Sequence, residues 1–182
     1  MKCTISGLLS TLLATVLVQT VLNRPAEAFT SAVTGTVTGE VIVNGTQVIS
    51  SGGVANATFV SNAGSQVISS SGLASATAIS SGGVQIISSG GVASATAVLS
   101  SGSQIVMSAG AVSGTLLSSG GVQTISSGGL ATSAVVLSKG VQRTSSGGSA
   151  TGTTVSTGGS AVVSSGGLLS TATVRSGGSV LV

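Results

Sequence analysis

The sequence predicts an all-β protein, a single-stranded parallel β-helix (β-solenoid) with about 19 residues per coil. Three observations support this prediction. Residues of one kind return at every nineteenth position, aliphatic residues alternate with Ser-Gly clusters, and charged residues make up only 4% of the chain. Disordered chains combine low hydrophobicity with high charge. This chain instead has a mean hydropathy of +0.71, so it must bury its Val, Ile and Leu side chains.

Residues 1–28 form a separate segment, for which the sequence predicts a secretory signal peptide. Lys2 precedes an uncharged apolar run from Ile5 to Leu22, Pro25 follows it, and residues 26–28 (Ala-Glu-Ala) match a signal-peptidase site. We therefore expect cleavage after Ala28, which leaves residues 29–182 as the repeat domain. A membrane anchor is the weaker alternative, because the run lies at the lower limit of a membrane-spanning length.

The repeat is read most clearly from six glutamines, each nineteen positions after the last: Gln47, Gln66, Gln85, Gln104, Gln123 and Gln142. The same step leads to Ala161 and Val180. Glycine stands two positions before each of these eight residues, and a second glycine column begins at Gly53. An apolar residue lies six positions before each of the eight, in a column that begins with Val41 and Val60. A linker has no reason to keep such a count.

Each unit holds two short apolar stretches, such as "VQII" and "VASATAV", divided by Ser-Ser-Gly-Gly corners. We expect the corner glycines to supply the positive φ angles of sharp turns. A strand this short cannot bury its own face, so each coil must stack on the next and form columns of like residues.

Side-chain parity assigns the inward face of each coil. Each Gln and the apolar residue two positions later share parity, so both are expected to point inward, and the Gln amides to form a ladder along the axis. Five threonines stand two positions before the apolar column and should share its face: Thr58, Thr77, Thr96, Thr115 and Thr153.

The composition argues against an enzyme. After residue 28 the sequence has no His, Cys or Asp and one carboxylate, Glu40, so no catalytic triad, paired carboxylates or metal ligand set can form. We therefore expect no catalytic residues, no metal and no cofactor. Lys139, Arg143 and Arg175 are too few for a nucleic-acid surface, and stacking aromatic residues are missing.

Hydroxyl groups are the remaining distinctive feature, concentrated at the predicted corners. Either Ser is simply a good turn residue, or the corners form a regular array of attachment points for sugars. The candidate O-glycosylation sites are Ser50, Ser51, Ser69, Ser70, Ser88, Ser89, Ser126, Ser127, Ser164 and Ser165.

The stretch "SGGVQTISSGGLATSAVVLSKGVQ" resembles the nineteen-residue repeat of AIDA-type autotransporter adhesins of Gram-negative bacteria, and the likeness covers residues 33 to 182. The resemblance implies an exported β-helical passenger at the cell surface, the outer membrane or outside the cell. It implies adhesion to host or abiotic surfaces, autoaggregation with like chains on neighbouring cells, and biofilm formation. It also implies O-glycosylation of serines by a heptosyltransferase.

The sequence departs from that family, whose passengers are longer and end in a transmembrane β-barrel with aromatic girdles. This sequence has no Trp or Tyr. We therefore expect export through a separate outer-membrane translocator, or a truncated product or fragment.

Two other functions fit the repeat. An ice-binding solenoid is suggested by the hydroxyl-x-Thr triplets at 75–77, 94–96, 113–115 and 151–153, although Ala134 and Ala172 interrupt them. The rod could also be a structural spacer or the remnant of a truncated autotransporter.

Overall fold

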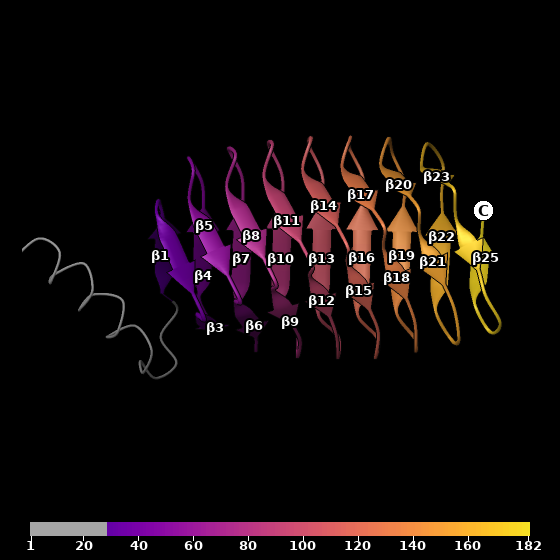
Figure 1. The fold of residues 1–182 in the computed structure, drawn as a ribbon, viewed down its shortest axis with the longest axis horizontal. Coiled ribbons are helices and arrows are strands. Elements are labelled where there is room, and N and C mark those ends of the chain that lie inside the picture. Colours follow the sequence, from indigo (N-terminus) through magenta and orange to yellow (C-terminus); the bar gives the residue numbers. More distant parts are fainter. Residues whose placement is uncertain (1–28) are drawn as a thin grey trace, which may run out of the picture.

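The computed structural model describes residues 29–182, which form a solenoid. The signal peptide predicted for residues 1–28, with its cleavage site at Ala28, lies outside the described residues. Consecutive coils stack along one axis with their strands perpendicular to it, so the molecule is a rod (Figure 1). Every ladder between strands is parallel and joins one coil to the next. The predicted single-stranded parallel β-helix is confirmed.

Three parallel sheets, here called A, B and C, make up the rod. Sheet A contains β1 (Thr30–Val33), β4 (Thr46–Ile49), β7 (Ser65–Ile68), β10 (Val84–Ile87), β13 (Ser103–Val106), β16 (Val122–Ile125), β19 (Val141–Thr144), β22 (Ser160–Val163) and β25 (Ser179–Leu181). Sheet B contains β2 (Thr36–Thr38), β5 (Val54–Asn56), β8 (Leu73–Ser75), β11 (Val92–Ser94), β14 (Ala111–Ser113), β17 (Leu130–Thr132), β20 (Ser149–Thr151) and β23 (Leu168–Ser170). Sheet C contains β3 (Val41–Val43), β6 (Phe59–Ser61), β9 (Ala78–Ile79), β12 (Ala97–Val98), β15 (Leu116–Leu117), β18 (Val135–Val136), β21 (Thr154–Val155) and β24 (Thr173–Val174).

Each coil therefore has three strands, where the sequence pattern indicated two apolar stretches. The second stretch breaks in the middle. In "VASATAV", Ala95 has a φ of 51°, which ends β11 at Ser94 and starts β12 at Ala97. We call the three bends the AB, BC and CA corners, after the sheets that each one joins. The BC corner is the shortest, with two residues between strands.

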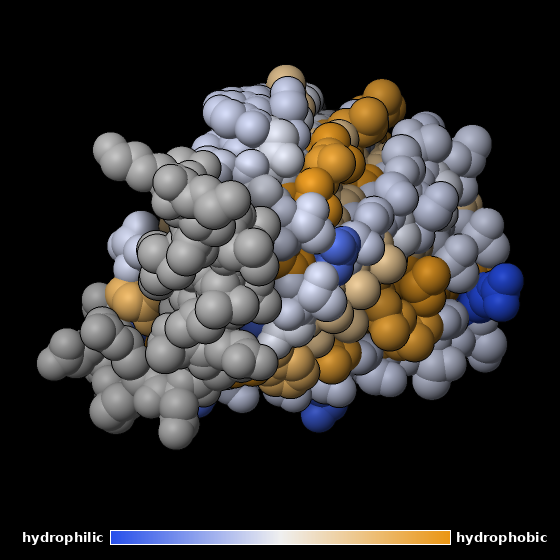
Figure 2. All heavy atoms as spheres, turned by 60° about the vertical axis from the view of Figure 1, so that its left-hand side comes forward, coloured by the Kyte–Doolittle hydropathy of each residue, from blue (hydrophilic) through white to orange (hydrophobic). Residues whose placement is uncertain are grey.

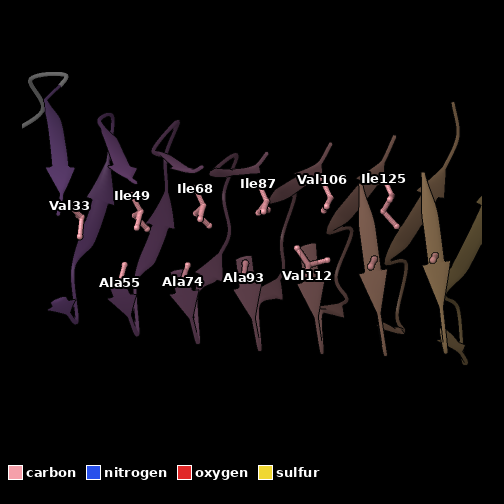
Figure 3. Close-up of a cluster of buried hydrophobic side chains, with 12 residues drawn as sticks. Val33, Ile49, Ala55, Ile68, Ala74, Ile87, Ala93, Val106, Val112 and Ile125 are labelled. Atoms are coloured by element: carbon pink, nitrogen blue, oxygen red, sulfur yellow. The ribbon is translucent and has the colours of Figure 1, made fainter. Parts of the chain in front are cut away.

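The core consists of two columns of apolar side chains that run the length of the rod. One lies between sheets A and B, where Ile49, Ile68 and Ile87 face Ala55, Ala74 and Ala93 (Figure 3). The other lies along sheet C and includes Ile79, Val98 and Leu117. The side chains of both columns are almost fully buried. The predicted stacking of apolar residues into buried columns is thus confirmed, with two columns in the core.

The nineteen-residue register fails in the first coil. The sequence pattern placed Val41 in the buried column with Val60, but Ile42 pairs with Val60, eighteen residues on. Ile42 is buried and Val41 is 54% exposed. The first coil has two residues in its AB corner, Thr34 and Gly35, where the next coil has four. It also has a shorter CA corner, which shifts Ile42 rather than Val41 into the column.

The glycine columns serve a different purpose from the predicted one. The column from Gly53 and the column from Gly45 contain no glycine with a positive φ. Instead, a Cβ at Gly72, Gly91 or Gly129 would overlap the backbone carbonyl group of the preceding coil. These positions need glycine because two backbones approach closely there. The predicted positive φ angles are confirmed at the first glycine of each Gly-Gly corner, such as Gly90 and Gly128, and most of the residues before these glycines also have a positive φ.

Candidate functional site

The AB corners carry all ten predicted sugar sites, and each AB corner after the first has four residues. In the corner 88–91, Ser88 and Gly91 are joined by a 2.8 Å hydrogen bond from the Gly91 amide to the Ser88 carbonyl oxygen. Ser89 and Gly90 lie between them with φ angles of 48° and 78°. These two left-handed residues form a tight turn, in which Ser89, the second residue of the corner, is exposed.

The candidate serines therefore differ by position within a pair. The first serines, Ser50, Ser69, Ser88 and Ser126, are half-buried, whereas the second ones, Ser51, Ser70, Ser89 and Ser127, are exposed. Ser164 and Ser165 are both exposed. The exposed corner residues form a column held by backbone hydrogen bonds, for example 2.7 Å from the Ser89 amide to the Ser108 carbonyl oxygen.

Sequence reasoning missed two exposed members of this column, Ser108 and Ser146, because it looked for Ser-Ser pairs and overlooked the pair at 145–146. The nineteen-residue step from Ser89 would have found Ser108, which follows Met107. Sequence reasoning also missed a second hydroxyl column at the CA corners. That column contains Ser81, Ser100, Ser119, Ser138, Thr157 and Ser176, all exposed. Two hydroxyl columns thus border the two sides of sheet A.

Inside the rod, a polar ladder separates the two apolar columns. From Gln66 onward, each Gln Nε2 donates to the Oε1 of the Gln in the preceding coil, at 2.7 Å for Gln66 to Gln47 and 2.6 Å for Gln123 to Gln104. The Gln side chains of the ladder are almost fully buried. All the amides point the same way along the axis, so neighbouring hydrogen bonds polarise one another. The predicted inward amide ladder is confirmed.

The threonine column supports this ladder and does not face solvent. Thr77, Thr96 and Thr115 each donate through Oγ1 to the Gln Oε1 of their own coil, at 3.1 to 3.3 Å. Each of these threonines is 1% exposed. The threonines of the hydroxyl-x-Thr triplets that suggested ice binding are therefore not on the surface, because the BC corner turns each of them inward.

The ladder is closed differently at its two ends. The Gln47 Nε2 donates to Glu40 Oε2, because residue 31 of the preceding coil is a short serine. Glu40 occupies the position of the threonine column that lies one coil before Thr58. Within residues 29–182, Thr58 Oγ1 is the one buried side-chain oxygen or nitrogen without a hydrogen-bond partner. At the other end Ala161 replaces Gln, and the larger Leu169 contacts both apolar columns.

Glu40 is expected to make stability depend on pH. Burial raises the pKa of the Glu40 carboxyl, and the hydrogen bond from Gln47 opposes this shift without cancelling it. The folded chain then binds this proton more tightly than the unfolded chain, so the free energy of unfolding should fall as pH rises through the raised pKa. Urea unfolding between pH 4 and pH 7 measures this slope. Glu40→Gln should remove it, and an unchanged slope in that variant would assign the effect elsewhere.

Residues 29–182 contain no group of three or more His, Cys, Asp or Glu side chains that could hold a metal ion. Within the same range, no helix is long and apolar enough to cross a membrane. Lys139 and Arg143 are both exposed, Lys139 in a CA corner and Arg143 on the outer face of sheet A.

Comparisons with known proteins agree with this geometry. A family model described as "Adhesin of bacterial autotransporter system, probable stalk" matches residues 44–102 and 68–121. A crystal structure of a TibC-catalysed, hyper-glycosylated fragment of TibA matches with a TM-score of 0.72 and 35% sequence identity. The repeats are AIDA-type adhesin stalk repeats. The TibA match covers 84% of this chain, while the chain spans 62% of the TibA fragment. No curated protein sequence matches the chain.

Most positions of the AIDA-type repeat have a definite structural role. In the unit from Val84 to Gly102, Gln85 and Thr96 belong to the polar ladder, and Ile87, Ala93 and Val98 fill the two apolar columns. Gly91 and Gly102 allow close stacking on the preceding coil, and Ser89 and Ser100 form the outer hydroxyl columns. The repeat thus combines a specified interior with hydroxyl columns at two of its three corners.

Proposed function

We propose that the chain is a non-enzymatic adhesin-type passenger module, exported to the cell surface or the surrounding medium. The observation that carries this proposal is a rod of AIDA-type stalk repeats whose two corners beside sheet A carry columns of exposed hydroxyl groups. Such a rod repeats hydroxyl groups at the same corners of successive coils, which suits repeated contacts with extended surfaces. The partners are host or abiotic surfaces and like chains on neighbouring cells, and the contacts support autoaggregation and biofilm formation.

The exposed column of the AB corners is the proposed site of O-glycosylation. It contains Ser51, Ser70, Ser89, Ser108, Ser127, Ser146 and Ser165. The support is that these hydroxyls are exposed at tight turns, and that the matching TibA fragment was hyper-glycosylated by TibC. A heptosyltransferase is the proposed enzyme. Ser50, Ser69, Ser88 and Ser126 are poorer acceptors because they are half-buried.

Export is proposed to use residues 1–28 as a signal peptide, with cleavage after Ala28. A separate outer-membrane translocator would carry the rod across the outer membrane. The repeats from residue 29 onward fold without cysteine, so folding outside the cytoplasm needs no disulfide chemistry.

One experiment tests adhesion and glycosylation together. Bacteria display the chain with and without a co-expressed AIDA-type heptosyltransferase, and intact mass, cell aggregation and binding to abiotic surfaces are measured. We expect mass increments of whole heptose units and stronger binding than by bare cells. A variant with all seven AB-column serines changed to alanine is the matched control, because Ala109 already adopts the same left-handed φ, at 62°. The alanine variant should lose most of the added mass. If cells that display the unchanged chain bind no better than bare cells, the adhesin function is contradicted.

A further inference from the structure

The positively charged side chains of residues 29–182 stand together on one side of the rod, in its C-terminal part. They are Lys139, Arg143 and Arg175, whereas residues 41–138 contain no charged side chain. Lys139 and Arg175 lie in CA corners, and Arg143 points outward from β19, the strand that follows Lys139. All three are exposed. On the face drawn in Figure 2, strongly hydrophilic residues are few and lie among pale and aliphatic ones. We call Lys139, Arg143 and Arg175 the cationic group.

The cationic group is compact along the axis of the rod. Lys139 follows β18 and Arg175 follows β24, and β21 is the one strand between these two in sheet C, so their corners are about 10 Å apart. The Lys139 amide donates to the Gly158 carbonyl oxygen at 2.7 Å, and the Gly158 amide donates to that of Gly177 at 2.7 Å. Glycine therefore occupies the position of Lys139 in the next two coils, and no side chain there separates Lys139 from Arg175. The long Lys and Arg side chains can reach the same ligand across this bare stretch.

No carboxylate side chain of residues 29–182 lies near enough to neutralise the cationic group. Glu40 is the one such side chain, and it hydrogen-bonds to the inward-pointing Gln47. Glu40 precedes β3, which lies five strands from β18 in sheet C, so it stands about 24 Å from Lys139 along the axis. That distance exceeds the screening length of about 8 Å at physiological ionic strength. The positive charges are therefore available to an external anion.

The surroundings of the cationic group favour a carbohydrate over a membrane or a nucleic acid. Ser138, Thr157 and Ser176 lie in the same CA corners with exposed hydroxyl groups, which suit hydrogen bonds to sugar hydroxyls. None of the large exposed apolar side chains of residues 29–182 lies in a CA corner, so nothing there can insert into a lipid surface. Single-stranded nucleic acids stack on aromatic rings, and sheet A and the CA corners contain none.

We propose that the cationic group and the CA hydroxyls beside it bind an acidic polysaccharide of the polyuronate class, which lies along the axis of the rod. A polyuronate carries one carboxylate on each sugar, and a sugar unit is about as long as a coil is high, so its sparse charges match three cations spread over a few coils. The two arginines can pair with planar carboxylates through two parallel hydrogen bonds each. Exposed ion pairs contribute little individually, so one rod binds weakly, and many rods on one cell bind firmly.

Biolayer interferometry of the purified chain, made without a heptosyltransferase, on immobilised polygalacturonate tests this inference. We expect binding that weakens as the salt concentration rises. The variant Lys139→Ser/Arg143→Thr/Arg175→Ser should bind about tenfold more weakly, since it loses three exposed ion pairs. Each new residue already stands at the same position of another coil, as Ser101, Thr124 and Ser156, so the variant keeps the fold. Circular dichroism melting checks this.

Two controls separate a specific site from net charge. The first adds Ala57→Lys/Ala95→Lys/Ser133→Lys to the triple variant, which restores the net charge at exposed BC corners. These residues have φ angles of 51° to 54°, and Lys139 itself adopts a left-handed φ of 67°. The relocated variant should bind as weakly as the triple variant. The second control is fully methyl-esterified polygalacturonate, which has the same backbone without charge and should not bind the unchanged chain.

Several results would overturn the proposal. They are no binding to polygalacturonate, full binding by the triple or the relocated variant, and tighter binding to phosphatidylserine vesicles or duplex DNA, which would reassign the cationic group to a membrane or a nucleic acid.

The inference deepens the proposed adhesin function and rests on it for its biological setting, but the two can fail separately. If the purified chain binds polygalacturonate while displayed cells adhere no better than bare cells, the inference is supported and the adhesin function is contradicted. If displayed cells adhere while the purified chain does not bind, the inference alone is overturned.

Discussion

Replacing Gly91 with alanine is expected to destabilise the rod by about 3 kcal/mol, whereas the same change at the adjacent Gly90 should cost about 1 kcal/mol. A methyl group on Gly91 would lie 2.6 Å from the carbonyl carbon of Ile68 in the preceding coil. That carbonyl accepts an axial hydrogen bond from the Ser88 amide, so it cannot move aside without breaking the stack. At Gly90 a methyl group meets nothing within 4 Å, and the cost is only the strain of a φ of 78°.

Urea unfolding followed by circular dichroism at 218 nm, a wavelength typical of β-structure, measures both variants. The pair is internally controlled, because the two glycines are neighbours in the same turn and lose the same amount of backbone freedom. Equal losses of stability would mean that φ, and not close packing, explains the glycine column. A larger loss at Gly90 would mean the same.

Replacing Gln85 with alanine is expected to cost about 4 kcal/mol, because it combines a cavity with lost hydrogen bonds. Gln85 Oε1 accepts from Gln104 Nε2 at 2.7 Å and from Thr96 Oγ1 at 3.3 Å, and both donors would be left buried without an acceptor. Gln142→Ala is the matched control at the end of the ladder. There the Thr153 hydroxyl loses its acceptor and the Gln123 Oε1 loses its donor, so one buried donor is left unpaired instead of two. We expect a smaller loss of about 3 kcal/mol, because an unpaired carbonyl oxygen costs less than an unpaired N–H group.

The chain itself suggests a partial rescue. Where Ala161 replaces Gln, Leu169 stands at the position that Ala93 occupies in the Gln85 coil, and it contacts both apolar columns. Adding Ala93→Leu to Gln85→Ala should therefore recover about 1 to 2 kcal/mol by filling the cavity, while Gln104 Nε2 stays unpaired. No recovery would show that hydrogen bonding, and not volume, accounts for the whole loss. Equilibrium unfolding of the four chains gives all the differences needed.

The interior was largely predictable from the sequence, because each coil repeats the same environment. Gln66, Ile68 and Thr77 are buried as their parity and period required. In a stacked solenoid, each residue has its nineteenth neighbours directly above and below, so a column in the sequence is a column in space. The failure at Val41 came from the first coil, whose shorter corners break the period that the prediction used.

The candidate site was predicted less completely. The corner serines were placed at turns, but the sequence could not separate the half-buried Ser88 from the exposed Ser89, because that difference depends on the φ angle of each turn residue. The search for Ser-Ser pairs also missed Ser108 and the whole CA column. The role of Glu40 at the end of the ladder was not predicted, since its partner Gln47 lies across the coil and not beside it in the sequence.

The sequence by itself determined that this protein is a stack of nineteen-residue coils with Gln and aliphatic side chains inside, since a fixed period leaves no other way to bury so much apolar surface without charges. Only the tertiary structure decided how many sheets each coil contains, why its glycines are needed and which corner hydroxyls are exposed. Those features depend on one left-handed residue such as Ala95 and on the approach of one backbone to another, which a period cannot reveal.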